Sequence, residues 1–317
     1  MTNKKIVILG TGGTIAGLAS NTSSNVDYTA AQVGVSQLVG AVEGLGSQVE
    51  TEQVAQIDSK DMTFEVWTAL ANRVHHHLTR ADVHGVVITH GTDTIEETAY
   101  FLQVVLCPSK PVVLTCAMRP ASALAPDGPQ NILDAVTVAR HEGAQGVVVV
   151  CAGCIHSALD VQKVHTYQLN AFGSGDAGVI GLIEENTLRL MRNWPSAHIN
   201  RAQAATKNIA RLNQTTTWPT VEIVTSYTGV SGWLVDSLLA HGVAGLVVAG
   251  TGNGTVHHAL EAALRKAQAS GVDVVRATRC TQGRVLARAD DLFPTSNDLS
   301  PVKARVAMML RLMGINS

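Results

Sequence analysis

The sequence predicts an α/β protein with two domains. The larger, N-terminal domain has a mainly parallel sheet flanked by helices, and the smaller, C-terminal domain is also α/β. Short apolar runs alternate with segments of helical spacing in both halves of the chain, whose 317 residues suffice for two hydrophobic cores. Only 4% of the residues are aromatic, so Val, Leu, Ile and Ala must fill the core, which suits a parallel sheet buried on both faces.

The N-terminal domain is assigned to residues 1–188, where strand-like and helix-like segments alternate. The run at 6–9 is a short buried strand that ends at a glycine-rich turn, and apolar residues recur at helical spacing from 65 to 78. Further strands are expected at 54–57, 85–89, 111–114 and 146–150, and further helices at 95–106 and 131–140. This β-α-β alternation implies parallel strands with helices on both faces of the sheet.

The pattern fades between residues 189 and 219, where Asn, Gln and Thr accumulate, and we interpret this stretch as an inter-domain linker. The alternation then restarts, so residues 220–317 are assigned to the C-terminal α/β domain. Its strands are expected at 221–225, 245–249 and 272–277, and its helices at 234–241, 259–269 and 302–312.

Charge and hydropathy exclude several classes of partner. The formal net charge is −2 and basic residues are interspersed with acidic ones, so neither a nucleic acid nor an anionic membrane surface is an expected partner. No apolar run reaches the ~20 residues that span a bilayer. No secretory signal is visible, which predicts a cytoplasmic protein, although a mature periplasmic form with its leader removed would look the same.

Neither cysteines nor histidines predict a metal site. The five cysteines, an odd number in a long chain, fit reduced thiols better than a disulfide framework. Cys151 and Cys154 have redox spacing, but no second pair provides a zinc site, so we interpret the spacing as coincidental. The three histidines at 75–77 would point to different faces of a helix and would chelate poorly. We therefore expect no metal and no cofactor.

Three turns rich in glycine and in Thr or Asn follow buried strands. They are 11–14 (TGGT), 91–94 (GTDT) and 250–254 (GTGNG). Ligands of an open parallel sheet bind outside the carboxyl ends of its strands, and glycines let the backbone approach a ligand. The polar side chains of these turns are therefore candidate ligand-contacting groups.

Simpler explanations exist for the turns. Gly10 and Gly12 are followed by Ile15 instead of the third glycine of a dinucleotide fingerprint, and no lysine stands in the Walker position. A threonine or aspartate such as Thr92 or Asp93, taken alone, is more simply a helix cap. Two threonine turns together with a distant lysine favour a catalytic role.

Several segments together resemble the bacterial L-asparaginases, the asparaginase/glutaminase family. The two signature segments are matched at 11–17 (TGGTIAG) and 88–94 (ITHGTDT). The resemblance continues, in the same order along the chain, at 96–102, 110–113, 117–120, 125–131, 249–254 and 299–305. It spans nearly the whole chain, and it implies the asparaginase fold and hydrolysis of an amide.

The resemblance implies catalytic roles for five residues. Thr14 resembles the primary nucleophile, on a mobile loop that closes over the substrate, and Tyr28 resembles the loop tyrosine that hydrogen-bonds it. Thr92, Asp93 and Lys163 resemble a second nucleophilic constellation. These assignments agree with simple chemistry, because a threonine hydroxyl is a poor nucleophile until a base takes its proton.

Lys163 can act as that base only if it is partly neutral. Burial favours the neutral form, whereas a nearby carboxylate such as Asp93 opposes it. Binding of the substrate ammonium to Asp93 would relieve this conflict. Attack on an amide also needs donors for the developing oxyanion, and the backbone N–H groups of the Gly91–Thr92 turn are suitable candidates.

The resemblance also implies substrate contacts. Ser59 and Asp93 resemble the residues that hold the α-carboxylate and α-amino groups, and Asn253 resembles a residue that reaches the site of a neighbouring subunit. Substrate sites shared in this way imply a homo-oligomer, expected to be a tetramer built from intimate dimers.

The sequence departs from the family at two substrate-binding positions. Lys60 stands where Gln or Glu usually follows the serine, and a lysine there would repel an ammonium at close range. Near the C-terminus the family supplies a glutamate to the neighbouring site. Arg288 or Ala289 occupies that place here, and Asp290 is the nearest substitute acid. We therefore expect weakened binding of the substrate, unless Lys60 points outward or pairs with Asp58, Asp61 or Asp290.

The sequence as a whole predicts hydrolysis of the side-chain amide of L-asparagine to L-aspartate and ammonia, with minor glutaminase activity. A glutaminase-asparaginase of broad specificity is the alternative. A non-catalytic amino-acid-binding protein on the same fold would be expected to lose Thr14, Thr92 or Lys163, and all three are present. A tRNA-linked amidotransferase would be expected to carry extra segments and a basic surface, which the sequence does not show.

Overall fold

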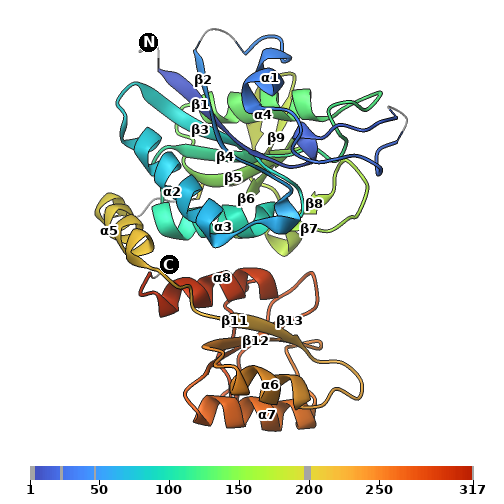
Figure 1. Ribbon diagram of the computed structural model, residues 1–317, viewed down its shortest axis with the longest axis vertical. Coiled ribbons are helices and arrows are strands. Elements are labelled where there is room, and N and C mark those ends of the chain that lie inside the picture. Colours follow the sequence, from blue (N-terminus) through green and yellow to red (C-terminus); the bar gives the residue numbers. More distant parts are fainter. Residues whose placement is uncertain (1–3, 22–23, 46–47, 196–200, 316–317) are drawn as a thin grey trace. The chain divides into compact units, whose positions relative to one another are not determined.

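The first part of the chain is organised around one sheet of eight strands, in the order β10-β9-β6-β5-β4-β3-β1-β2 (Figure 1). The computed structural model describes residues 4–21, 24–45, 48–195 and 201–315. It divides the chain into unit 1, Met1–Ala210, and unit 2, Arg211–Ser317. The predicted α/β class, with a large mainly parallel sheet and a separate smaller one, is confirmed.

Five strands of unit 1 run parallel, in the order β5-β4-β3-β1-β2. They are β1 (Lys5–Gly12), β2 (Val49–Ile57), β3 (Val83–Thr89), β4 (Pro111–Thr115) and β5 (Gly146–Cys151). The central strands β3, β4 and β5 are buried almost throughout, because helices cover both faces. This burial explains their continuous apolar sequences.

Three further strands continue the sheet in antiparallel fashion and were not predicted: β6 (Cys154–Ser157), β9 (Gly181–Glu184) and β10 (Thr187–Leu190). The reversal begins at a two-residue turn between β5 and β6. Ala152 and Gly153 have φ angles of 48° and 71° there, the left-handed conformation that a tight hairpin turn requires. Cys151 and Cys154 are therefore register partners that flank a hairpin turn.

Helices α1 (Val35–Gly40) and α4 (Gly128–Arg140) cover one face of the sheet, and α2 (Phe64–Thr79) and α3 (Ile95–Leu106) cover the other (Figure 1). Successive side chains of a strand point to opposite faces of the sheet, so each central strand contributes to the packing on both faces. Ile6 and Ile8 of β1 join the core under α1 and α4, whereas the intervening Val7 faces the opposite side and is equally buried.

The carboxyl ends of β1 and β2 lead into two short 3₁₀ helices, η1 (Thr14–Ala16) and η2 (Ser59–Asp61), and a third, η3 (Gly175–Ala177), follows later. Between β6 and η3, a two-stranded ribbon of β7 (Gln162–Lys163) and β8 (Phe172–Gly173) carries Lys163.

Unit 2 contains a parallel three-stranded sheet in the order β11-β12-β13. Its strands are β11 (Val221–Thr225), β12 (Gly245–Gly250) and β13 (Asp273–Thr278). Helices α6 (Trp233–Ala240) and α7 (His258–Ala269) pack on one face, and α8 (Pro301–Leu312) packs on the other (Figure 1).

The predicted linker at 189–219 includes a helix, α5 (Arg201–Gln214), and the boundary between the two units falls at 210/211 within it. Residues 196–200 of that stretch lie outside the described residues. Ala205, Ile209 and Leu212 are buried on α5 at helical spacing. Three apolar positions among many Asn, Gln and Arg residues were too few to indicate this helix from the sequence.

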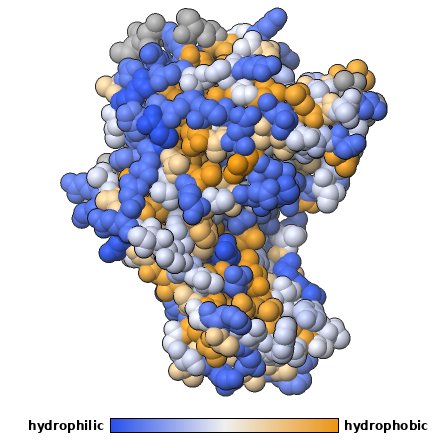
Figure 2. All heavy atoms as spheres, viewed as in Figure 1, coloured by the Kyte–Doolittle hydropathy of each residue, from blue (hydrophilic) through white to orange (hydrophobic). Residues whose placement is uncertain are grey.

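Several large apolar side chains are exposed. On the face shown in Figure 2, hydrophobic residues interrupt the hydrophilic surface of both units. The most exposed are Leu124 at 90%, Val26 at 75% and Trp233 at 74%. No helix among the described residues has both the length and the apolar composition needed to cross a bilayer.

Candidate active site

Segments that follow three neighbouring strands meet at glycines. Gly10 of β1 is in register with Thr89 of β3, so the turns after these strands leave the sheet side by side. A Cβ on Gly13 would overlap the Cα and N atoms of Gly91, and Gly13 has a φ of 82°. A Cβ on Gly91 would in turn overlap the hydroxyl of Ser59, which follows β2. Only glycine allows this approach, which gathers three polar turns at one edge of the sheet.

Thr14 begins η1 and is 7% exposed. Its Oγ1 lies 2.6 Å from the hydroxyl of Tyr28, as the sequence predicted. Leu18 and Thr29 form an antiparallel bridge with two 2.9 Å hydrogen bonds, which brings Tyr28 back beside η1. The ring of Tyr28 also packs against Gly17, where a Cβ would collide with it.

Thr92, Asp93 and Lys163 form the second predicted group. The Lys163 Nζ donates to Thr92 Oγ1 at 2.8 Å and to Asp93 Oδ1 at 2.6 Å. Thr92 is 6% exposed, whereas the side chain of Asp93 is 50% exposed and so remains accessible to a ligand. The turn is also tied to Ser59, because the Asp93 N–H donates to Ser59 Oγ at 3.2 Å and the Thr94 hydroxyl donates to the Ser59 carbonyl at 2.8 Å.

Lys60 is exposed and paired with two acidic side chains. Its Nζ lies 2.9 Å from Asp58 and 3.0 Å from Asp61, and hydrogen bonds to these two carboxylates raise its pKa above the usual value. The sequence predicted weakened substrate binding unless Lys60 pairs with a neighbouring acid. Because Lys60 does pair with Asp58 and Asp61, we no longer expect it to repel the substrate ammonium.

Asn253 and Asp290 belong to unit 2, whereas all of the groups above belong to unit 1. The Asn253 side chain holds the backbone of Leu286 through two hydrogen bonds. Its Oδ1 accepts from the Leu286 N–H at 2.7 Å, and its Nδ2 donates to the Leu286 carbonyl at 3.0 Å. Asp290 and Arg288 help to line a polar cavity of about 340 Å³ in the same unit.

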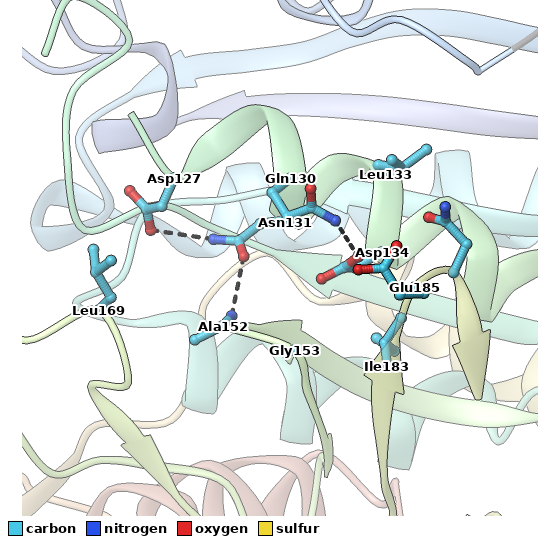
Figure 3. Close-up of a pocket in the computed structure, with 11 residues that line it drawn as sticks. Asp127, Gln130, Asn131, Leu133, Asp134, Ala152, Gly153, Leu169, Ile183 and Glu185 are labelled. Carbon is cyan, nitrogen blue, oxygen red and sulfur yellow. Dashed lines mark hydrogen bonds between the residues drawn. The ribbon is translucent and has the colours of Figure 1, made fainter. Parts of the chain in front are cut away.

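A partly buried hydrogen-bond network also fixes the chain after β4, and the sequence analysis assigned no individual role to its members (Figure 3). Asn131 Nδ2 donates to the Cys116 carbonyl at 2.9 Å and to Asp127 Oδ2 at 3.2 Å, while its Oδ1 accepts from the Ala152 N–H at 3.0 Å. The carboxylate of Asp127 also accepts the N–H groups of residues 118 and 119. The resemblance at 117–120 and 125–131 was the only sequence signal for this network.

Asp127 and Asn131 line one side of a cavity of about 420 Å³ that also contains Asp134 and Glu185 (Figure 3). Burial raises the pKa of the Asp134 carboxyl, whose Oδ1 accepts a hydrogen bond from Gln130. None of the residues predicted from the sequence lines this cavity. Within the described part of the chain, no three His, Cys, Asp or Glu side chains gather as a metal site would require.

Both units match family models. The one described as "Asparaginase, N-terminal" matches residues 5–196, and the one described as "Glutaminase/Asparaginase C-terminal domain" matches residues 220–314. These two ranges cover most of the chain.

Individual proteins are similar over nearly the full length. L-asparaginase 2 of Bacillus subtilis is 37% identical over 98% of this chain and 83% of its own. Glutaminase-asparaginase of Pseudomonas fluorescens biotype A is 37% identical over 97% of this chain and 86% of its own. The crystal structure of a probable cytoplasmic L-asparaginase from Campylobacter jejuni aligns with a TM-score of 0.89 and 37% identity, over 98% of this chain and 95% of that one.

Proposed function

Because the chain belongs to the asparaginase family, we propose that it hydrolyses the side-chain amide of L-asparagine to L-aspartate and ammonia. One observation carries the proposal. Two nearly buried threonine hydroxyls, on loops joined at Gly13 and Gly91, each contact a side chain able to exchange a proton. Thr14 contacts the Tyr28 hydroxyl and Thr92 contacts the Lys163 ammonium.

The reaction takes two steps. A threonine hydroxyl attacks the amide carbon and loses its proton, and ammonia leaves with a proton as an acyl ester forms. Water then cleaves the ester, which restores the hydroxyl and releases aspartate. We assign the nucleophilic roles to Thr14 and Thr92, and the proton transfers to Tyr28 and Lys163.

Developing charge on the amide oxygen needs fixed donors. The backbone N–H of Thr92 fits this role, because it has no acceptor among the residues that the structure describes. Lys163 also contacts Asp93, at 2.6 Å. A substrate ammonium bound to Asp93 would compete for that carboxylate and free Lys163 to accept the proton of Thr92.

Substrate anchoring falls to Ser59 and Asp93. They lie side by side, since Ser59 Oγ accepts the Asp93 N–H, and the exposed Asp93 carboxylate can bind an α-ammonium. Lys60 pairs with Asp58 and Asp61, and we assign it no direct contact with the substrate ammonium.

Asparagine is the proposed main substrate and glutamine a minor one. A broad glutaminase-asparaginase is the second candidate, because the P. fluorescens protein of that name is as similar to this chain as the B. subtilis asparaginase. Ammonia release from each amino acid under identical conditions distinguishes the two candidates.

We further propose a cytoplasmic homotetramer of intimate dimers, in which Asn253 and Asp290 of one subunit complete the site of another. Two exposed apolar side chains near the site support coverage by a neighbouring chain: Val164, which follows Lys163, and Tyr167, whose hydroxyl accepts from Asn25. The name of the C. jejuni protein supports the location. Specific activity should fall as dilution separates the subunits, and a fully active monomer would contradict the shared site.

The direct test is ammonia release from L-asparagine by the purified protein and by its Thr14→Ala and Thr92→Val variants. Each variant should retain its fold and lose turnover by at least about 100-fold, because each lacks a hydroxyl that reacts or exchanges a proton. Thr137→Val is the matched control, since it removes a hydroxyl that bonds only within α4. Normal turnover of Thr14→Ala or Thr92→Val would remove that residue from the mechanism. Binding of asparagine without ammonia release would instead indicate a binding protein.

A further inference from the structure

Behind the Thr92 turn, three buried side chains form a chain of hydrogen bonds that the mechanism above does not use. Trp67 of α2 donates its indole Nε1–H to Thr98 Oγ1 at 2.9 Å. Thr98 of α3 lies 3.0 Å from His90 Nε2, and His90 Nδ1 lies 2.8 Å from the carbonyl oxygen of Gly91. Trp67 is 4% exposed, and Thr98 and His90 are fully buried.

The chemistry of the two ends fixes the direction of every bond. An indole N–H can only donate and a carbonyl oxygen can only accept, so His90 Nδ1 must carry a hydrogen. Burial lowers the pKa of His90 to about 4, so the ring is neutral near pH 7 and its Nε2 accepts. The Thr98 hydroxyl therefore accepts from Trp67 and donates to His90. Only one tautomer of His90 satisfies all three bonds.

The last bond fixes the orientation of a peptide unit at the active site. The Gly91 carbonyl and the Thr92 N–H belong to one planar peptide, in which they point in opposite directions because the bond is trans. The carbonyl points at His90, so the Thr92 N–H points away from it. Gly91 has no side chain to restrict rotation of this unit, which makes an external hold on its carbonyl consequential.

We propose that His90 is a positioning residue, which holds the Gly91 carbonyl and thereby aims the Thr92 N–H at the amide oxygen of the substrate. Trp67 and Thr98 support it by allowing only the Nδ1–H tautomer. The opposite side of the turn is held separately, through Ser59 and the Asp93 N–H. The proposal rests on the proposed function, because it assigns His90 to the same oxyanion donor.

Two substitutions separate the two ends of the imidazole. Asparagine places its amide nitrogen as many bonds from Cα as His90 Nδ1, so His90→Asn retains a donor for the Gly91 carbonyl. Glutamine places its side-chain oxygen as many bonds from Cα as Nε2, so His90→Gln retains an acceptor for the Thr98 hydroxyl and loses the bond to Gly91. We expect kcat to fall at least about tenfold further in His90→Gln than in His90→Asn, with KM within about threefold, because a misaimed oxyanion donor affects mainly the transition state.

His77→Asn is the control for loss of a buried histidine. His77 lies near the C-terminal end of α2, is 2% exposed and lies 2.8 Å from Glu52. Its side-chain partners Glu52, Arg73 and Arg80 are not residues of the candidate active site. This variant should lose stability and keep its kcat. Equal kcat values for His90→Asn and His90→Gln, or an equal loss of kcat in His77→Asn, would overturn the positioning role.

Nitrogen-15 NMR of the wild-type protein identifies the tautomer of His90 independently of any activity measurement. The expected result is a His90 ring with hydrogen on Nδ1 and a bare Nε2. Hydrogen on Nε2 would overturn the proposal whatever the turnover. A wild-type protein that releases no ammonia from asparagine or glutamine would refute the proposed function instead, and the NMR result would still show whether the hydrogen-bonded chain exists.

Discussion

Gly13 and Gly91 pack backbone against backbone, so closely that a methyl group on Gly13 would occupy the space of the Gly91 Cα. This contact joins the turn after β1 to the turn after β3 and so determines how far apart Thr14 and Thr92 lie. The two threonine turns are 78 residues apart in the sequence, and their relation depends on strand register and on the absence of two side chains.

The contact predicts that Gly13→Ala will be severely damaging. The new Cβ meets backbone that cannot move aside, and the backbone conformation of Gly13, with φ 82° and ψ −172°, is essentially confined to glycine and adds about 1–3 kcal/mol of strain for an L-residue. Gly143→Ala is the matched control, because Gly143 has a φ of 83° and open space around it. Thermal unfolding and ammonia release should show strain alone in Gly143→Ala, and a greater loss of stability with loss of turnover in Gly13→Ala. Equal effects of the two would disprove the packing argument.

Lys163→Met should abolish most turnover while substrate binding changes little. The substitution keeps the bulk of the side chain but removes the Nζ that contacts Thr92, and general acid–base groups contribute about 10²–10⁴-fold. Lys266→Met removes a lysine that pairs with Asp236 in unit 2 and should retain full turnover. The measurement is kcat and KM for asparagine across pH. An active Lys163→Met protein with an unaltered pH profile would exclude the lysine as the base.

Lys60→Gln tests whether Lys60 faces the substrate. The lysine is paired with Asp58 and Asp61 and its side chain is 61% exposed, so the substitution should change KM for asparagine by less than about threefold. A large fall in KM would show that Lys60 turns toward the ammonium when substrate binds, as the sequence alone suggested.

The buried His90 should make the protein less stable in mild acid. Its pKa is about 4 in the folded chain against 6.5 for a free imidazole, so between these values the unfolded chain binds a proton that the folded chain does not. The stability contributed by neutral His90 is thus complete above pH 6.5 and declines as pH falls toward 4, by up to about 3 kcal/mol.

His90→Asn has no imidazole, so its free energy of unfolding should depend less on pH than that of the wild type between pH 4.5 and 6.5. The range ends at pH 4.5 so that the titration of Glu52 does not enter the comparison. The hydrogen bond to Arg73 lowers the pKa of Glu52 to about 2, so the stability that this carboxylate contributes is lost only below pH 4.5. Urea unfolding at several pH values measures the difference. Parallel pH curves for the two proteins would show that His90 is not neutral in the folded state.

Local sequence patterns located most of the regular elements of both units. Helix α3 and strand β11 have the predicted bounds, because α3 is almost wholly buried and apolar and β11 consists mainly of the β-branched residues Val, Ile and Thr. The antiparallel strands β6, β9 and β10 were missed, since they are only four residues long, and two of them are partly exposed and weakly patterned. Helix α5 was missed because its mean composition is polar.

The candidate site divides in the same way. The sequence located Thr14, Tyr28, Thr92, Asp93, Lys163 and Ser59, and the structure places them in hydrogen-bonded groups within unit 1. Lys60 was named from its position beside Ser59, but its direction depends on the two neighbouring aspartates. His90 stood inside a matched motif without a role, because its partners Trp67 and Thr98 come from two different helices.

The sequence by itself determined the α/β class, with a larger and a smaller domain, and the family, and it named the side chains to which we assign reactive roles. These properties depend on local periodicity and on residue types at fixed spacings, and both can be read directly from the sequence. Only the tertiary structure decided that Lys60 is neutralised by Asp58 and Asp61, that Asn131 braces the segment after β4, and that His90 is held in one tautomer. Each of these depends on distances of about 3 Å, where hydrogen-bond energy falls steeply with geometry. Strand register, burial and close packing set such distances.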